Sequence, residues 1–181
     1  VLYDYHKTRN SSHPREFLKN YSGICVTDGY QVYHKVEKER ENLRIAGCWV
    51  HARRKFDEAM NVVPKEQRKK SNAYLIMKQI QAIYREEGKL QELPPDERLM
   101  QRQLVIKPLV DALFVYLKKM EPTVPSSGQL RKAYTYILNQ EKYLRVFLED
   151  GEVPIDNNAS ERAIRGFCIG KKNWQMIATI N

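Results

Sequence analysis

The stretch GICVTDG, residues 23–29, decides the fold. Ile24, Cys25 and Val26 form a compact apolar run of the kind found in buried strands, and it stops at the turn sequence Thr-Asp-Gly. A strand that ends in a turn of this kind places its last side chains at the edge of a sheet. Asp28 is therefore expected at the carboxyl end of a buried strand, where α/β folds tend to bind ligands.

The segments on either side of this strand alternate in character. Residues 1–5 are apolar and aromatic and predict a strand, and Pro14 lies where the first turn of a short helix would begin. A second apolar run, residues 45–50, follows a charged loop at residues 37–44. The order strand, helix, strand, helix, strand predicts an α/β fold with a mixed sheet.

After residue 53 the chain reads as almost entirely helical, up to about residue 149. Proline-rich breaks at residues 94–95 and 122–128 punctuate it. We interpret the apolar residues at helical spacing as the core of a packed helical subdomain. They form three stripes: Ile76, Ile80 and Ile83; Val105, Leu109, Ala112, Leu113 and Tyr116; and Leu130, Ala133, Tyr134, Ile137 and Leu138.

Composition narrows the class of protein. Lysine and arginine outnumber aspartate and glutamate by 31 to 22, and the net charge of +9 favours a polyanionic partner, most often nucleic acid. Charge alone is weak evidence, because many basic proteins bind no nucleic acid. Three widely spaced cysteines predict a reducing compartment, and no apolar run is long enough for a membrane span or a signal peptide. We therefore expect a cytoplasmic protein.

Two carboxylates are candidates for chemistry, and each has a simpler explanation. Asp28 precedes a glycine, and Asp-Gly is also a common turn dipeptide. Glu161 lies three residues after Asn158, a spacing typical of a helix capping box. Capping does not explain why Asp156 and Asn157 also precede this arginine-rich helix.

Cys48 and His51 stand three positions apart, which is half of a tetrahedral zinc site. No second pair has comparable spacing, so we expect them to lie buried beneath the site instead. Basic residues cluster at residues 53–55 and 171–172, the latter beside Trp174. Such clusters suit DNA contact through phosphate pairing and stacking, although a charged run is more often a solvated helix face.

Taken in order, four segments resemble a known family: TDGY at 27–30, GCWVHARRKF at 47–56, IDNNASERAIR at 155–165 and GKKNW at 170–174. Together they resemble the transposases of the insertion sequence sixty-six family, over nearly the whole chain. The resemblance implies a ribonuclease H-like catalytic core, incomplete at its first strands, with a large helical insertion. On this basis residues 1–55 belong to the core, 56–149 form the insertion, and 150–181 return to the core.

By motif match, Asp28 corresponds to the second and Glu161 to the third catalytic carboxylate of such a DDE transposase. The first aspartate of the family lies upstream of the segment that matches residues 1–5. Asp4 matches a later, non-catalytic strand, so we expect this chain to be a catalytically inactive fragment. In the complete active site the resemblance implies two Mg²⁺ (or Mn²⁺) ions bound by Asp28 and Glu161.

The resemblance also implies partners: insertion-sequence ends and target DNA, a homo-oligomer assembled on DNA, and a bacterial, nucleoid-associated setting. Two other functions remain open, a non-catalytic DNA-binding or assembly module and a ribonuclease H-like nuclease. Asn157 and Asn158, with Cys48 and His51, are expected to support the site. The residues expected to contact DNA are Arg53, Arg54, Arg162, Arg165, Lys171, Lys172 and Trp174.

Overall fold

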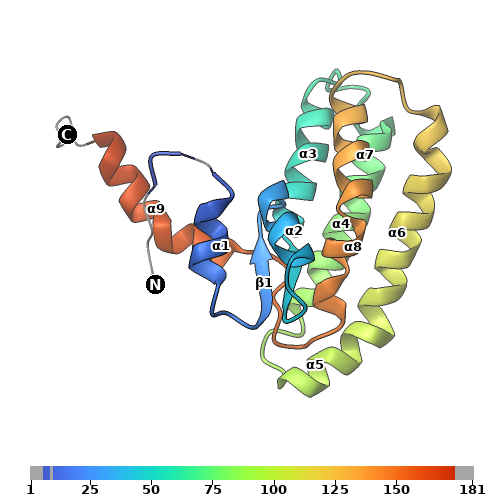
Figure 1. Ribbon diagram of the computed structural model, residues 1–181. Helices are drawn as coiled ribbons and strands as arrows, with labels where there is room; N and C mark the ends of the chain where they lie inside the picture. The colour runs from blue at the N-terminus through green and yellow to red at the C-terminus, as the bar shows by residue number, and fades with distance from the viewer. Residues whose placement is uncertain (1–5, 9, 174–181) are drawn as a thin grey trace.

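The computed structural model describes residues 6–8 and 10–173 (Figure 1). Its described part contains a small parallel sheet, in which β1 (Gly23–Thr27) pairs with β2 (Leu43–Gly47) in the register Gly23 to Leu43 and Thr27 to Gly47. The helix α2 (Gln31–Lys38) makes the crossover between the two strands. Both strands therefore end at the same edge, as parallel strands must. The expected strand at residues 1–5 lies outside the described residues.

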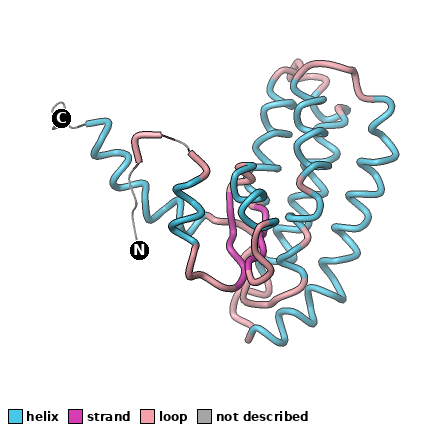
Figure 2. Tube along the Cα trace, viewed as in Figure 1, coloured by secondary structure: helices cyan, strands magenta, loops and turns pink. Residues whose placement is uncertain are grey.

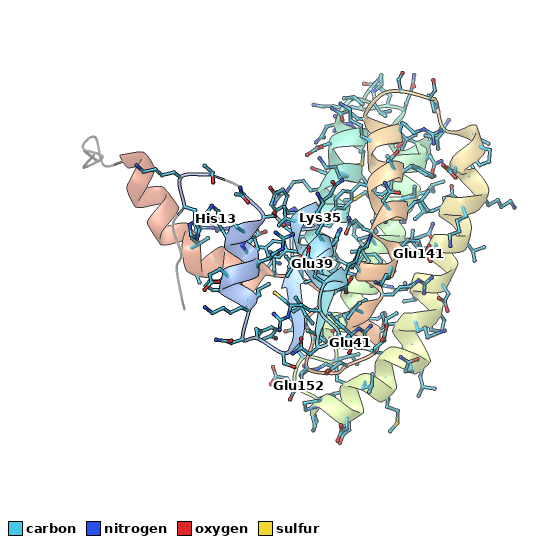
Figure 3. All side chains as sticks on the ribbon, in the orientation of Figure 1. His13, Lys35, Glu39, Glu41, Glu141 and Glu152 are labelled. Atoms are coloured by element: carbon cyan, nitrogen blue, oxygen red, sulfur yellow. The ribbon has the colours of Figure 1, made fainter. Side chains whose placement is uncertain are left out.

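Short helices cover this sheet. In the view of Figure 2 the strands lie between α1 (Ser12–Leu18) and the upright helices. Arg15 of α1 binds both carboxylate oxygens of Glu39, at 2.6 and 2.7 Å; Glu39 follows α2 and is labelled in Figure 3. A small apolar cluster lies beneath this contact and consists of Leu18, Val36, Leu43, Ile45 and Tyr143.

Two boundaries in this region differ from expectation. The run at residues 45–50 is a strand only as far as Gly47, and α3 (Trp49–Asn61) begins two residues later. The segment at 37–44 is not wholly a loop either, since its ends belong to α2 and β2. An apolar run does not distinguish a strand from the buried start of a helix. Trp49, the first residue of α3, is fully buried, as a residue of a buried strand would be.

The long helical region is confirmed as an upright group of helices (Figure 1). Short 3-10 turns occupy 68–70, 121–123 and 146–148, and residues 102–106 form a π-helical turn. The last helix, α9 (Asn158–Asn173), leaves the helical group on the side of α1 (Figure 1). The principal helices of this region are α4 (Asn72–Gly88), α5 (Pro95–Gln101), α6 (Lys107–Met120), α7 (Gln129–Asn139) and α8 (Glu141–Leu144).

The first and third apolar stripes line the core, but the second is wrong in part. Val105 is 40% exposed and Ala112 is also exposed, whereas Ile106 and Val110 are fully buried. Adjacent positions in this stretch are apolar, as at 104–106 and 109–110, so the spacing of apolar residues does not distinguish between two neighbouring helix faces. The buried side chains of this stretch are Ile106, Val110, Leu113, Phe114 and Leu117.

A buried ion pair anchors the segment that leads into α9. Arg102 is 1% exposed, and its Nε lies 3.1 Å from both carboxylate oxygens of Glu87. Its Nη1 donates to the carbonyl oxygens of Phe147, at 2.8 Å, and Asp150, at 2.6 Å. Burying a charge is costly unless it is paired, and here both charges are. The pair therefore fixes residues 147–150 against the helices.

The main hydrophobic core is continuous from the end of β2 to the segment before α9. It begins at Ala46 and Trp49, runs through the helices and ends at Val153 and Ile155. Residues 151–155 form a loop without a strand or helix. Among the described residues no helix combines the length and hydropathy needed to cross a membrane.

Candidate active site

Asp28 lies on an exposed turn directly after β1. Its Oδ1 accepts a hydrogen bond from the backbone N–H of Tyr30 at 3.0 Å, and Gly29 has a φ of 83°. A side chain is strained at that φ, and a Cβ on Gly29 would lie 2.8 Å from Oη of Tyr136. Tyr136 Oη in turn donates to the backbone oxygen of Asp28 at 3.2 Å. The turn that carries the carboxylate is thus fixed from both sides.

Cys48 joins the end of β1 to the returning chain. Its N–H donates to the carbonyl oxygen of Thr27 at 3.1 Å, and its Sγ accepts from the N–H of Asn157 at 3.5 Å. The thiol is buried, and burial raises its pKa, which keeps it protonated. The next residue, Trp49, donates its N–H to the carbonyl oxygen of Ile155 at 3.2 Å. The segment before α9 therefore lies at the edge where both strands end.

His51 and Glu161 meet across this junction. Nε2 of His51 lies 3.2 Å from Oε1 of Glu161, and the two side chains are 20% and 35% exposed. His51 projects from the first turn of α3, and Glu161 from the first turn of α9. A partly buried carboxylate held by an imidazole has a defined orientation, which a solvent-exposed glutamate lacks.

The start of α9 is capped by a residue other than the one expected. Asp156 accepts hydrogen bonds from the N–H of Asn158 at 3.1 Å and from its side-chain amide at 2.9 Å. The N–H of Glu161 bonds to the carbonyl oxygen of Asn157, at 3.1 Å. Because Asp156 takes the capping role, the Glu161 carboxylate is turned to His51. The side-chain oxygen of Asn157 is buried without a hydrogen-bond partner in the described part of the chain.

Sequence reasoning missed Tyr84, which holds Asp156. Its hydroxyl donates to Oδ2 of Asp156 at 3.2 Å, and burial, together with the nearby carboxylate, raises the Tyr84 pKa above its usual value. The guanidinium of Arg53 lies over the Tyr84 ring, 5.6 Å from its centroid. Tyr84 is 72 residues from Asp156 in sequence, and nothing in its helical surroundings sets it apart before the chain is folded.

The residues expected to contact DNA fall into three groups. Arg53 and Arg162 line one pocket of about 470 Å³ beside Tyr84, and Arg54 lies with Arg53 on an adjacent hollow. Arg165 is exposed on α9. The side chains of Lys171 and Lys172 and the whole of Trp174 lie outside the described residues.

The donor set suits a hard divalent cation only in part. Asp28 and Glu161 supply carboxylate oxygens, the ligands that Mg²⁺ prefers. Across residues 6–8 and 10–173, no group of three or more His, Cys, Asp or Glu side chains is placed to hold a metal ion. Cys48 does not serve, because its thiol is engaged by a backbone N–H and is kept protonated.

Comparison with known proteins finds relatives of this chain. The chain is similar to two proteins of Sinorhizobium fredii (strain NBRC 101917 / NGR234), the uncharacterized proteins y4qI and y4hP. The first is 30% identical over 198 residues, covering 99% of this chain and 36% of the relative. The second is 29% identical over 184 residues, covering 96% and 33%. The chain therefore spans about a third of the length of these relatives.

No solved structure matches the chain. The sequence matches the Transposase IS66 family over residues 1–181, and the match includes the segments that carry Asp28, His51 and Glu161. The chain belongs to the Transposase IS66 family.

Proposed function

We propose that this chain supplies two of the catalytic carboxylates, Asp28 and Glu161, of a DDE transposase that cuts insertion-sequence ends and joins them to target DNA. The observation that carries the proposal is the His51–Glu161 contact at 3.2 Å. It places a positioned carboxylate at the edge where β1 and β2 end, and Asp28 follows β1 at that edge. Family membership supports the reaction class.

In this proposal the parallel strands and their crossover helix belong to a ribonuclease H-like core. Residues 1–55 and 150–181 would form that core, and 56–149 the helical insertion. Asp28 and Glu161 would bind Mg²⁺ or Mn²⁺ together with a further carboxylate. Two bound ions would supply the activation of water or a terminal 3′-hydroxyl and the stabilisation of the leaving oxygen.

The other side chains would hold the carboxylates and the DNA. His51 orients Glu161, while Cys48 and Asn157 fix the return of the chain at the strand ends. Outer-shell groups of this kind matter because a ligating carboxylate must be held in one orientation to be effective. The DNA backbone would be bound by phosphate contacts, which fix its register without reading sequence. The residues proposed for these contacts are Arg53, Arg54, Arg162, Arg165, Lys171, Lys172 and Trp174.

The polypeptide of residues 1–181 is further proposed to bind metal poorly and not to cleave DNA, because two carboxylates leave the ligand set short. The complete protein is proposed to assemble as a homo-oligomer on DNA, since two ends must be brought together. It would act in the bacterial cytoplasm at the nucleoid.

The test compares Asp28→Asn and Glu161→Gln in the full-length protein, with Glu66→Gln, an exposed glutamate on the loop after α3, as the matched control. Strand transfer and DNA binding are measured on the same preparations. We expect both variants to lose transfer and keep binding, with the control unchanged. Retention of transfer by both variants would overturn the proposal in favour of a non-catalytic module. Cleaved but never joined products would indicate a nuclease.

A further inference from the structure

A second pocket borders the turn at Gly29, on the side of the helical region. Its volume is about 390 Å³, and it lies between the turn at Gly29 and the exposed side of α7. Tyr136, which bonds to the backbone of Asp28, forms part of its wall. Lys55 from α3 and Lys132 from α7 also line the pocket. Lys55 belongs to the basic cluster at 53–55, whereas Lys132 and the other α7 residues lie outside every motif that predicts DNA contact.

The pocket has the charge of an anion site. Among the described residues that line it there is no carboxylate, and its side chains are lysine, arginine, amide and hydroxyl groups. The larger pocket beside Tyr84 differs, because Glu87, Glu152 and Asp156 line it together with its arginines. A phosphate in the second pocket would therefore meet donors without a facing carboxylate, whereas the larger pocket would present both charges.

Two of its cations are available to a ligand. Arg131 is committed to the fold, since it donates to the carbonyl oxygen of Pro125 at 2.9 Å and approaches the carboxylate of Glu121 at 3.4 Å. Lys132 is exposed, and the contact of Lys55 with Glu58 is long, at 3.4 Å. An ammonium group on a flexible stem is a suitable point charge for a phosphate.

The pocket wall next to the Gly29 turn contains a buried polar atom that lacks a hydrogen-bond partner among the described residues. Gln140 is 7% exposed, and its Oε1 makes no hydrogen bond within the described part of the chain. This oxygen lies close to the turn, 3.3 Å from the position of a Cβ built on Gly29. A buried polar atom of this kind normally has a partner, which an ordered water at a wet ligand site would provide.

We propose that this pocket binds a backbone phosphate of the DNA strand that passes Asp28, through Lys55 and Lys132. The helical region would then hold the substrate directly, through α7, as well as supporting the core. The inference rests on the proposed function for its choice of ligand. It goes beyond that function because it assigns a DNA contact to α7, in the helical region.

The experiment measures binding of the full-length protein to a fluorescent insertion-end duplex and to an unrelated duplex, at several salt concentrations. Variants Lys55→Ala, Lys132→Ala and the double variant are compared with Lys119→Ala, an exposed lysine at the end of α6. Each lost phosphate contact lowers the slope of log affinity against log salt by about 0.9. We expect that decrease for the double variant, at most the same decrease for each single variant, and the same loss on both duplexes.

Unchanged slopes in the double variant would overturn the inference, and so would an equal decrease in Lys119→Ala, which would indicate diffuse charge. Equal thermal melting of all variants shows that folding is not the cause. The outcome is separable from that of the carboxylate test. If Asp28→Asn retains strand transfer while Lys132→Ala loses a phosphate contact, the pocket binds DNA but the proposed catalysis fails. The opposite pair of results rejects the pocket alone.

Discussion

His51 Nε2 and Glu161 Oε1 lie 3.2 Å apart, although 110 residues separate them in the sequence. The intervening chain leaves the end of the sheet through α3, forms the helical region, and returns through residues 151–157 to the same edge. The contact therefore depends on how the two ends of this intervening segment pack against each other at that edge. Small changes along the closing segment would move the glutamate relative to Asp28.

Replacing His51 with alanine is expected to lower strand transfer by about 10–100-fold, the usual effect of removing an outer-shell partner from a ligating group. DNA binding should stay the same, because His51 holds the carboxylate and not the DNA. The conservative variant His51→Gln keeps a donor and should recover part of the activity. Transfer assays at saturating DNA measure this, and a fully active His51→Ala protein would show that Glu161 needs no such partner.

Gly151→Ala is expected to destabilise the fold by about 1–3 kcal/mol or more, as overpacking does. A Cβ at that position would lie 1.9 Å from the carbonyl oxygen of Pro95, a backbone atom that cannot move aside cheaply. Gly88→Ala at the end of α4 is the control, since its Cβ meets nothing within 4 Å. Denaturant unfolding should show a loss for the first and no loss for the second. Equal stabilities would mean that the loop and α5 separate without cost.

Arg102→Met is expected to cost about 3–5 kcal/mol of unfolding free energy, because it leaves the Glu87 carboxylate buried and unpaired. The double variant Arg102→Met/Glu87→Leu should recover part of that loss by removing the orphaned charge. Recovery should be incomplete, since Arg102 also binds the carbonyl oxygens of Phe147 and Asp150. Chemical denaturation of the wild type, Arg102→Met, Glu87→Leu and the double variant gives the coupling. Additive single losses would argue against a coupled pair.

Alkaline pH is expected to destabilise the protein partly through Tyr136. Burial, and then the nearby Cys48 and Asp28, raise its pKa to about 12, whereas a free tyrosine ionises near 10. The unfolded chain therefore loses the proton first, so this contribution is complete below about pH 10 and is lost as pH rises toward 12. Tyr136→Phe should flatten that fall.

At neutral pH the same Tyr136→Phe change removes a hydrogen bond to the Asp28 backbone and should cost about 0.5–1.5 kcal/mol. Unfolding curves measured from pH 8 to 12 contain both effects. Parallel curves for wild type and Tyr136→Phe over that range would contradict the shifted ionisation.

Much of the fold follows from local sequence. The strand at residues 24–26, the turn at Asp28 and the long helical region are confirmed because each depends on residues close together in the chain. The π-helical turn at 102–106 was not predictable from the spacing of apolar residues. The burial of Arg102 in this turn against Glu87 was not predictable either, because an arginine in a helix normally predicts an exposed face.

The motifs indicated which residues belong to the candidate site, but they did not predict which of those residues contact one another. The sequence indicated Cys48, His51 and Glu161, but assigned Glu161 a capping role as its simpler explanation. That role went to Asp156, since Tyr84 and Asn158 hold its carboxylate in place. Contacts over 72 or 110 residues depend on how helices from distant segments meet, which spacing along one segment does not encode.

Because the core is continuous, the sheet and the helices of this chain cannot be exchanged independently in evolution. Trp49 begins α3 and packs against Phe114 and Phe147, with ring centroids 6.4 and 6.1 Å apart, and its Nε1 donates to the carbonyl oxygen of Leu144. Grafting the helices of a distant homologue onto this sheet would leave that indole without its matched surface. Such chimaeras should fold only when residues on both sides of the junction are inherited together.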